Sequence, residues 1–190
     1  MKKVLILIVI VAFVAVGCGG SGTTSAPSAP VNQCLVGAPD WVMNGGAEGG
    51  FSAAGSSKIT AAGLSFARTA AMGNARDEMA RSISVKVNNM LKDFTQVTGI
   101  GNDAVVDKVT ASVSQQVASQ TLEGTVQKAS WTSPCSELHI LVAADSAAVQ
   151  AAVKQSVNSS YKDEKALWQQ FQAQKAQDEL SSAINKEFPK

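Results

Sequence analysis

Apolar side chains recur at steps of three or four residues between residues 72 and 94, and this is the strongest periodic pattern in the chain. Its members are Met72, Ala75, Met79, Ile83, Val87, Met90 and Phe94. Charged residues fall mostly between them, as in an amphipathic helix that packs one face on a core. The pattern predicts a long helix from about Thr60 to Phe94. Because the methionines share their face with aliphatic and aromatic residues, we interpret them as core rather than as a soft-metal or cofactor stripe.

A short apolar run near the start of the chain predicts export. Lys2 and Lys3 precede Val4–Val16, a run of 13 apolar residues. As a helix this run would be about 20 Å long, which is shorter than the roughly 30 Å hydrocarbon core of a bilayer. We therefore expect a cleaved signal peptide over residues 1–17 rather than a permanent transmembrane helix.

The apolar run closes with Ala15, Val16, Gly17 and Cys18, which resembles the lipobox of bacterial lipoproteins, with Ala15 where Leu is usual. We expect cleavage before Cys18 and lipidation of its sulfur. Acyl chains such as palmitate on this residue would anchor the protein in a membrane, at about 0.8 kcal/mol per buried methylene. Gly19 follows the cysteine where an Asp would favour retention in the inner membrane, so we expect the outer membrane.

The mature chain is expected to have three parts. Residues 18–33 form the lipidated cysteine and a flexible tether of Gly, Ser, Thr, Ala and Pro; residues 34–157 form the main domain; residues 158–190 form a helical extension. Removal of residues 1–17 leaves 173 residues with 14 basic and 15 acidic side chains. This near-neutral balance argues against nucleic acid as a partner, because phosphates require a basic face.

Cys34 and Cys135 are the two thiols that remain once Cys18 is lipidated. An exported protein meets an oxidising compartment, so we expect these two cysteines to form a disulfide. A metal site is the alternative. It lacks ligands, because one histidine and two cysteines without CxxC or HxxxH spacing do not make a zinc cage. We therefore expect no metal and no cofactor.

Further elements follow from local patterns. We expect a strand over residues 51–57, a helix from Asp103 to Ser119 with Asp103 as its N-cap, and a helix capped by Asp145 that loosens near residues 158–160. Residues 122–133 and 136–144 are rich in strand-forming residues and flank a Ser-Pro turn, which predicts an antiparallel hairpin.

The C-terminal tail, residues 161–188, has a helical composition with a thin apolar stripe. We expect this tail to pack on its own domain, with pairing to a second chain as the alternative.

Candidate catalytic groups are sparse. His139 is the only histidine, and it alternates with Leu138 and Ile140 as a strand residue does. General acid–base catalysis by His139 would need a partner acid or a nucleophile. The sequence has no GxSxG or HExxH motif. The glycines near residues 45–50 lack the Lys and Ser or Thr of a phosphate-binding loop. We expect that the protein is not an enzyme, and we assign no catalytic residue.

The order of several motifs is similar to that of a known family. These are GAPDWV at residues 37–42, the FSAAG strand, the helix at residues 67–87, and LEGTVQKASW followed by ELHILVAAD. Together with the lipobox they resemble the bacterial Lpp-twenty-type lipoproteins, which include a twenty-kilodalton surface lipoprotein antigen and flagellum-associated relatives. The resemblance implies a two-layer α+β domain, with a small antiparallel sheet of about three strands packed against a long helix and further helices, and a non-enzymatic role.

Two functions are compatible with the sequence. The first is a structural or protein-interaction lipoprotein of the envelope, in a surface or flagellum-associated assembly, with an envelope protein or a second copy as partner. The second is a periplasmic module that binds a small apolar ligand or a glycan, which is suggested by Trp41, Trp131 and Trp168.

Overall fold

The structure is a computed structural model that describes residues 32–47 and 51–189. The expected signal peptide, Cys18 and the tether as far as Val31 lie outside the described residues. The described residues belong to one compact unit that begins at Asn32.

Three strands form one antiparallel sheet: β1 (Phe51–Lys58), β2 (Val126–Thr132) and β3 (Glu137–Ala144), in the order β1-β3-β2. The central strand β3 forms the expected hairpin with β2 and also pairs with β1. Phe51 pairs with Ala144 at one end of the sheet, and Lys58 pairs with Glu137 at the other end, next to the β2–β3 turn. The sequence-based expectation of a small antiparallel sheet of about three strands is confirmed.

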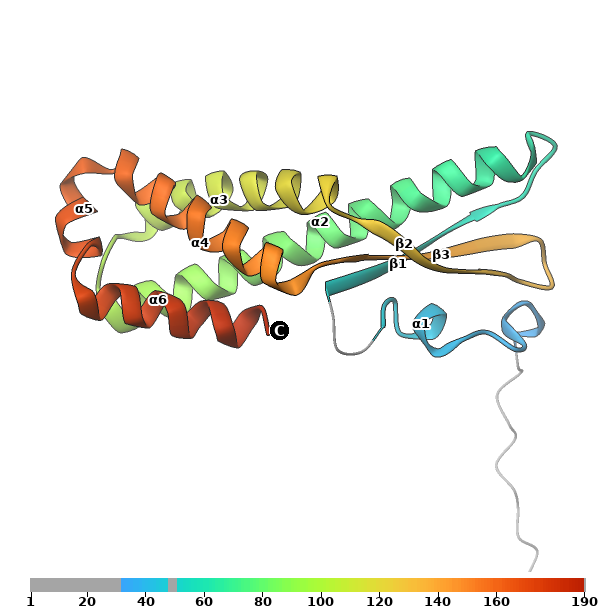
Figure 1. Cartoon of the computed structure of the whole chain (residues 1–190), viewed down its shortest axis with the longest axis horizontal. Helices are drawn as coiled ribbons and strands as arrows, with labels where there is room; N and C mark the ends of the chain where they lie inside the picture. Colours follow the sequence, from blue (N-terminus) through green and yellow to red (C-terminus); the bar gives the residue numbers. More distant parts are fainter. Residues whose placement is uncertain (1–31, 48–50, 190) are drawn as a thin grey trace, which may run out of the picture. The chain divides into compact units, whose positions relative to one another are not determined.

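Helices make up most of the remainder (Figure 1). Within the described residues they are α1 (Asp40–Met43), α2 (Gly63–Thr98), α3 (Asp103–Glu123), α4 (Ser146–Asp163), α5 (Lys165–Phe171) and α6 (Gln174–Glu187), with a 3-10 turn η1 (Gln33–Leu35) before them. One layer is the sheet and the other is helical, with α2 packed against β1 and β3. The α+β class implied by the family resemblance is therefore confirmed.

The long helix α2 buries the apolar stripe that the sequence predicted. Its buried residues are Ala67, Ala71, Ala75, Met79, Ile83, Val87, Met90, Leu91 and Phe94. Met72 is half-buried and packs against this core. The interpretation of the methionines as core residues is confirmed, because Met79 and Met90 are almost fully removed from solvent.

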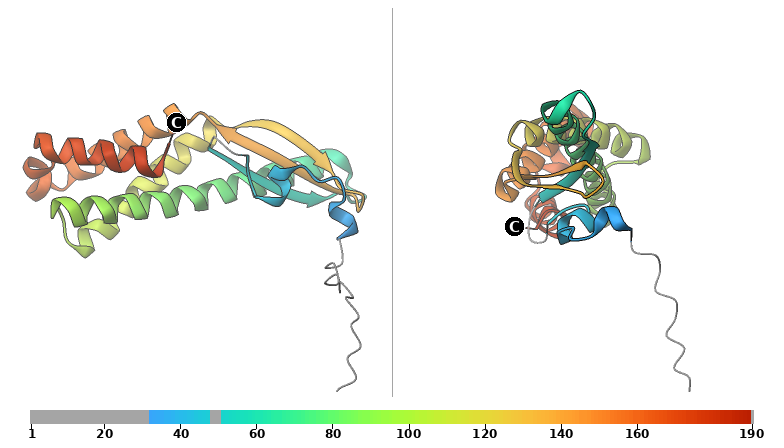
Figure 2. Two further views of the ribbon diagram at one scale, coloured as in Figure 1. Left: turned by 90° about the horizontal axis from the view of Figure 1, so that it is seen from below. Right: turned by 90° about the vertical axis from the view of Figure 1, so that its right-hand side faces the viewer.

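The first part of α2 approaches the sheet closely because both surfaces carry small residues. Gly55 of β1 faces Ala71 and Ala75 of α2, and both alanines are fully buried. The rest of α2 continues beyond the sheet and packs against α3 and α6 (Figure 2). A single helix thus joins a strand-covered half of the domain to a helix-covered half.

Aromatic rings fill the helical half. Tyr161 stacks on Phe171 with ring centroids 4.4 Å apart, and Phe94 meets each of these rings edge-on at 6.0 Å. Leu180 and Phe188 of the C-terminal tail are also buried. The expectation that the tail packs on its own domain is confirmed.

Two local expectations were wrong. The fourth helix does not loosen at residues 158–160 but continues to Asp163, so the predicted boundary between residues 157 and 158 falls inside α4. The reason is tertiary: Ser160 is buried against α3 and donates a hydrogen bond to the Ser112 hydroxyl at 3.2 Å.

The second wrong expectation concerns the start of α3. Its N-cap is Asn102, whose side chain accepts from the Val105 N–H at 3.1 Å, and Asp103 is the first helical residue. Asp145 does cap α4, as expected.

Candidate functional site

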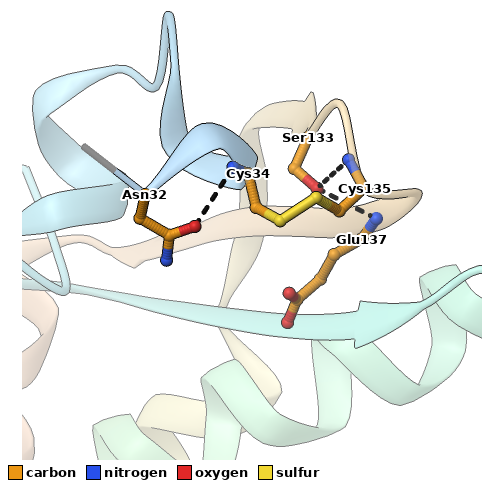
Figure 3. Close-up of a disulfide and its surroundings, with 5 residues drawn as sticks. All are labelled: Asn32, Cys34, Ser133, Cys135 and Glu137. Carbon is orange, nitrogen blue, oxygen red and sulfur yellow. Dashed lines mark hydrogen bonds between the residues drawn. A yellow bond between two sulfur atoms is a disulfide. The ribbon is translucent and has the colours of Figure 1, made fainter. Parts of the chain in front are cut away.

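Cys34 and Cys135 are joined in a disulfide, the pair expected from the sequence (Figure 3). Their Cα atoms are 5.1 Å apart, and 101 positions separate them in the chain. Cys34 lies in η1, and Cys135 lies in the turn between β2 and β3. The bridge therefore connects the start of the described chain to the tip of the hairpin.

Side-chain hydrogen bonds hold both ends of the bridge in place. The Ser133 hydroxyl accepts from the backbone N–H of Cys135 at 3.2 Å and of Glu137 at 3.1 Å, which closes the turn. The Asn32 side chain accepts from the Cys34 N–H at 3.1 Å. Cys135 is exposed and Cys34 is half-buried, so the bridge is open to solvent.

Residues 32–47, which we call the N-terminal segment, lie on the side of the sheet away from α2. Leu141 is only 5% exposed, although it points to the face opposite Ile140 and Val142, which pack in the main core. Helix α1 of the segment contacts β3 on that side. The far end of the segment is hydrogen-bonded to β1, where Gly45 O accepts from the Ala54 N–H at 2.9 Å. The disulfide holds the other end.

The structure places His139 in β3 as a packed strand residue. Its ring centroid lies 5.3 Å from that of Trp131, which is its register partner on β2. The Nε2 atom of His139 is buried and makes no hydrogen bond with the described residues.

The three tryptophans lie on three different elements: Trp41 on α1, Trp131 on β2 and Trp168 on α5. Trp131 packs against His139, and Trp168 stacks on Phe171 at 5.8 Å. Four surface cavities of about 200 to 530 Å³ lie between helices or beside the end of the sheet, and none of these four is lined by a tryptophan. These four cavities therefore do not support the alternative in which the tryptophans bind a small ligand or a glycan.

Ionisable groups of the described residues pair mainly at the surface. A hydrogen bond from Lys108 to Glu164 raises the pKa of that lysine, and one from Lys186 to Asp93 at 2.6 Å does the same for Lys186. These pairs are solvent-exposed and contribute little to stability. Within residues 32–47 and 51–189, no three His, Cys, Asp or Glu side chains group as metal ligands would. Among the helices of these same residues, none combines the length and apolar character needed to cross a membrane.

These features define a class of protein: a two-layer α+β domain whose N-terminal segment is fastened by a disulfide to the tip of its own hairpin. A model of the LPP20 lipoprotein family matches residues 39–145, which is more than half of the chain, and the chain belongs to that family. The comparison with curated proteins gives no match. Membership in a lipoprotein family implies a membrane-anchored envelope protein.

The family match confirms the resemblance read from the sequence motifs and gives its extent. It begins at Pro39, just before α1, and ends at Asp145, the N-cap of α4. The sheet, α2 and α3 therefore fall inside the match. Cys34 and the helices α4 to α6 fall outside it, so the disulfide and the packed tail are features that the match does not cover.

Proposed function

We propose that this protein is a lipid-anchored lipoprotein of the outer membrane whose domain has a structural or protein-interaction role, and not an enzymatic one, in a surface or flagellum-associated assembly. The observation that carries the proposal is membership in the LPP20 lipoprotein family together with Cys18 at the end of a lipobox. The acyl chains on Cys18 supply the membrane attachment, and the folded domain meets the partner.

The described domain supports this role in two ways. Its interior is filled by side chains from both layers, as in a rigid body that presents its outer surface to a partner. The tether expected from the sequence has 15 residues between Cys18 and Cys34, and a flexible chain of that length would hold the domain about 20 Å from the bilayer. A partner within that distance is therefore met at a raised local concentration.

The anchor is tested by Cys18→Ser in cells that receive labelled palmitate. We expect the parent protein to carry label and to float with outer-membrane fractions, and the variant to be unlabelled and released. The matched control is the double variant Cys34→Ser/Cys135→Ser, which loses its disulfide thiols but keeps Cys18. A Cys18→Ser protein that still floats with outer membranes would contradict lipid anchoring, and a labelled parent found in inner-membrane fractions would contradict the outer-membrane location.

The interaction role is tested by chemical crosslinking in intact cells, followed by mass spectrometry of the purified adducts. We expect a reproducible envelope protein in the adducts of the parent, and a smaller yield with Cys18→Ser, because the released variant loses the raised local concentration. Adducts that contain only a second copy of this chain would assign the role to self-association. Repeated absence of any protein adduct would count against the proposal.

A further inference from the structure

Three connections of the domain lie at one end, which we call the turn end: η1, residues 59–62 between β1 and α2, and residues 133–136 between β2 and β3. The views in Figures 1 and 2 place all three at this end. Two contacts join them directly. The Ile59 N–H donates to Ser136 O at 2.8 Å, and the disulfide links Cys34 to Cys135.

Large apolar side chains are exposed at the turn end. Leu64 and Phe66, in the first turn of α2, are 49% and 59% exposed, and Val36, next to η1, is 57% exposed. Side chains of a helix lean toward its N-terminus, so Leu64 and Phe66 project toward the turn end. We treat these exposed apolar side chains as candidates for a contact surface.

Basic side chains accompany these apolar ones. Lys58 ends β1 and Arg68 follows Phe66 in α2; both are exposed, and neither forms an ion pair with another described residue. Apolar side chains that project outward beside unpaired cations are the combination that binds the interface of a phospholipid bilayer.

The described chain begins at the same end, at Asn32. The disulfide holds Cys34 at the β2–β3 turn, which is where the chain that leads to Cys18 is joined to the domain. Without the bridge, α1 would still contact β3 and Gly45 would still accept from Ala54, but no covalent link would hold Cys34 at the turn end. The disulfide thus fixes the start of the described chain at the turn end.

Lengths limit which surfaces can reach the membrane. Helix α2 has 36 residues and is about 54 Å long. Fifteen residues separate Cys18 from Cys34, and a flexible chain of that length spans about 20 Å on average and at most about 50 Å when fully extended. With Cys18 in a bilayer, a connection of about 20 Å would place the turn end nearer to the membrane than the far end of α2.

We propose that the turn end is a membrane-docking surface that inserts Leu64 and Phe66 into the phospholipid bilayer that holds the acyl chains of Cys18. Lys58 and Arg68 contact the lipid phosphates. This inference rests on the lipidation of Cys18 proposed above. It adds that the domain lies against its own membrane by one defined end and leaves the helical end free for a protein partner.

The test compares two photocrosslinking positions in the full chain as purified from cell membranes and reconstituted in vesicles of phosphatidylethanolamine and phosphatidylglycerol. A benzophenone side chain replaces Phe66 in one sample and Val97 in the other. Val97 is a matched control because it lies on the same helix, near the opposite end, and is 58% exposed. After irradiation, mass spectrometry measures the lipid adducts of each protein.

We expect lipid adducts at position 66 to exceed those at position 97 several-fold. Equal yields at the two positions, or adducts at position 66 that contain only protein, would overturn the inference. The mass of the N-terminal peptide in the same samples reports the state of Cys18. An acylated Cys18 with no lipid adduct at position 66 refutes the docking surface alone, whereas an unmodified Cys18 refutes the proposed anchor and the docking surface with it.

Discussion

Replacing Gly55 with alanine tests how the sheet and α2 fit together. Gly55 lies in the middle of β1, opposite Ile140, with the backbone of α2 directly above it. An added Cβ would lie 2.5 Å from Ala71 O and 2.8 Å from Ala75 Cα. Ordinary contact at a Cβ begins near 3.4 Å. The strand and the helix must therefore separate by roughly 1 Å, and neither obstacle is a side chain that could rotate away.

The cost follows from overpacking a closely packed interface. Inserting one carbon into a well-packed core costs about 1 to 3 kcal/mol. We expect the upper part of this range, about 2 to 3 kcal/mol, because the atoms met are backbone and because the buried Ala53 shares the same face of β1. For a domain of this size each kcal/mol lowers Tm by about 2 to 4 °C, so Tm should fall by about 4 to 12 °C.

Urea unfolding of the oxidised protein, followed by circular dichroism, measures the effect as a lower midpoint at an unchanged slope. Gly73→Ala is the matched control because Gly73 is an exposed residue inside α2 whose added Cβ would meet no atom within 4 Å. This control should raise stability by about 0.5 to 1 kcal/mol, since glycine is a poor helix former. A Gly55→Ala protein as stable as the parent would refute the close approach of β1 and α2.

Three further predictions concern other parts of the structure. Burial raises the pKa of Tyr161, the only tyrosine in the sequence, above its ordinary value of 10.0. The folded state therefore holds the phenol proton more tightly than the unfolded state does. The contribution of this residue to the free energy of unfolding should be constant below about pH 10 and fall above it. Ultraviolet titration should show this delayed ionisation, Tyr161→Phe should remove the alkaline loss, and ionisation near pH 10 with the fold intact would contradict it. Leu180→Ala should lower the free energy of unfolding, measured in urea, by about 2 to 5 kcal/mol, because Leu180 is buried. The control Lys175→Ala, at an exposed position of the same helix, should change it by less than about 0.5 kcal/mol. Equal effects of the two variants would show that α6 is not packed. Cys34→Ser/Cys135→Ser should lower the free energy of unfolding by about 2 to 4 kcal/mol, which is below the chain-entropy limit of about 4.7 kcal/mol. Thiol titration of denatured, unreduced mature protein should find no free thiol. Two free thiols would rule out the bridge.

The elements that the sequence predicted well are those specified by short-range patterns. The helical stripe ending at Phe94, the hairpin around Pro134 and the cap at Asp145 each depend on residues within a few positions of one another. The disulfide was predictable for a different reason, because the expected export of the chain and lipidation of Cys18 leave only two thiols to pair. The family resemblance rested on the order of such local motifs, and the match over residues 39–145 confirms it.

Contacts between distant residues were not predictable from these patterns. Residues 158–160 resemble a helix break, yet Ser160 is held in α4 by a hydrogen bond to Ser112 of α3. Gly55 resembles a weak point in a strand, yet its missing side chain is what admits the backbone of α2. Both depend on a neighbour that arrives from elsewhere in the chain, which a local pattern does not contain.

The sequence by itself determined the long amphipathic helix, the strand segments and the cysteine pair, because hydrophobic periodicity and the count of thiols act locally or by elimination. Only the tertiary structure decided which segments meet. It buries the aromatic rings of the tail beside Phe94, and it brings η1, the start of α2 and the β2–β3 turn to one end of the domain. The physical reason is that strand order, helix approach and the position of a bridge follow from the packing of the whole core.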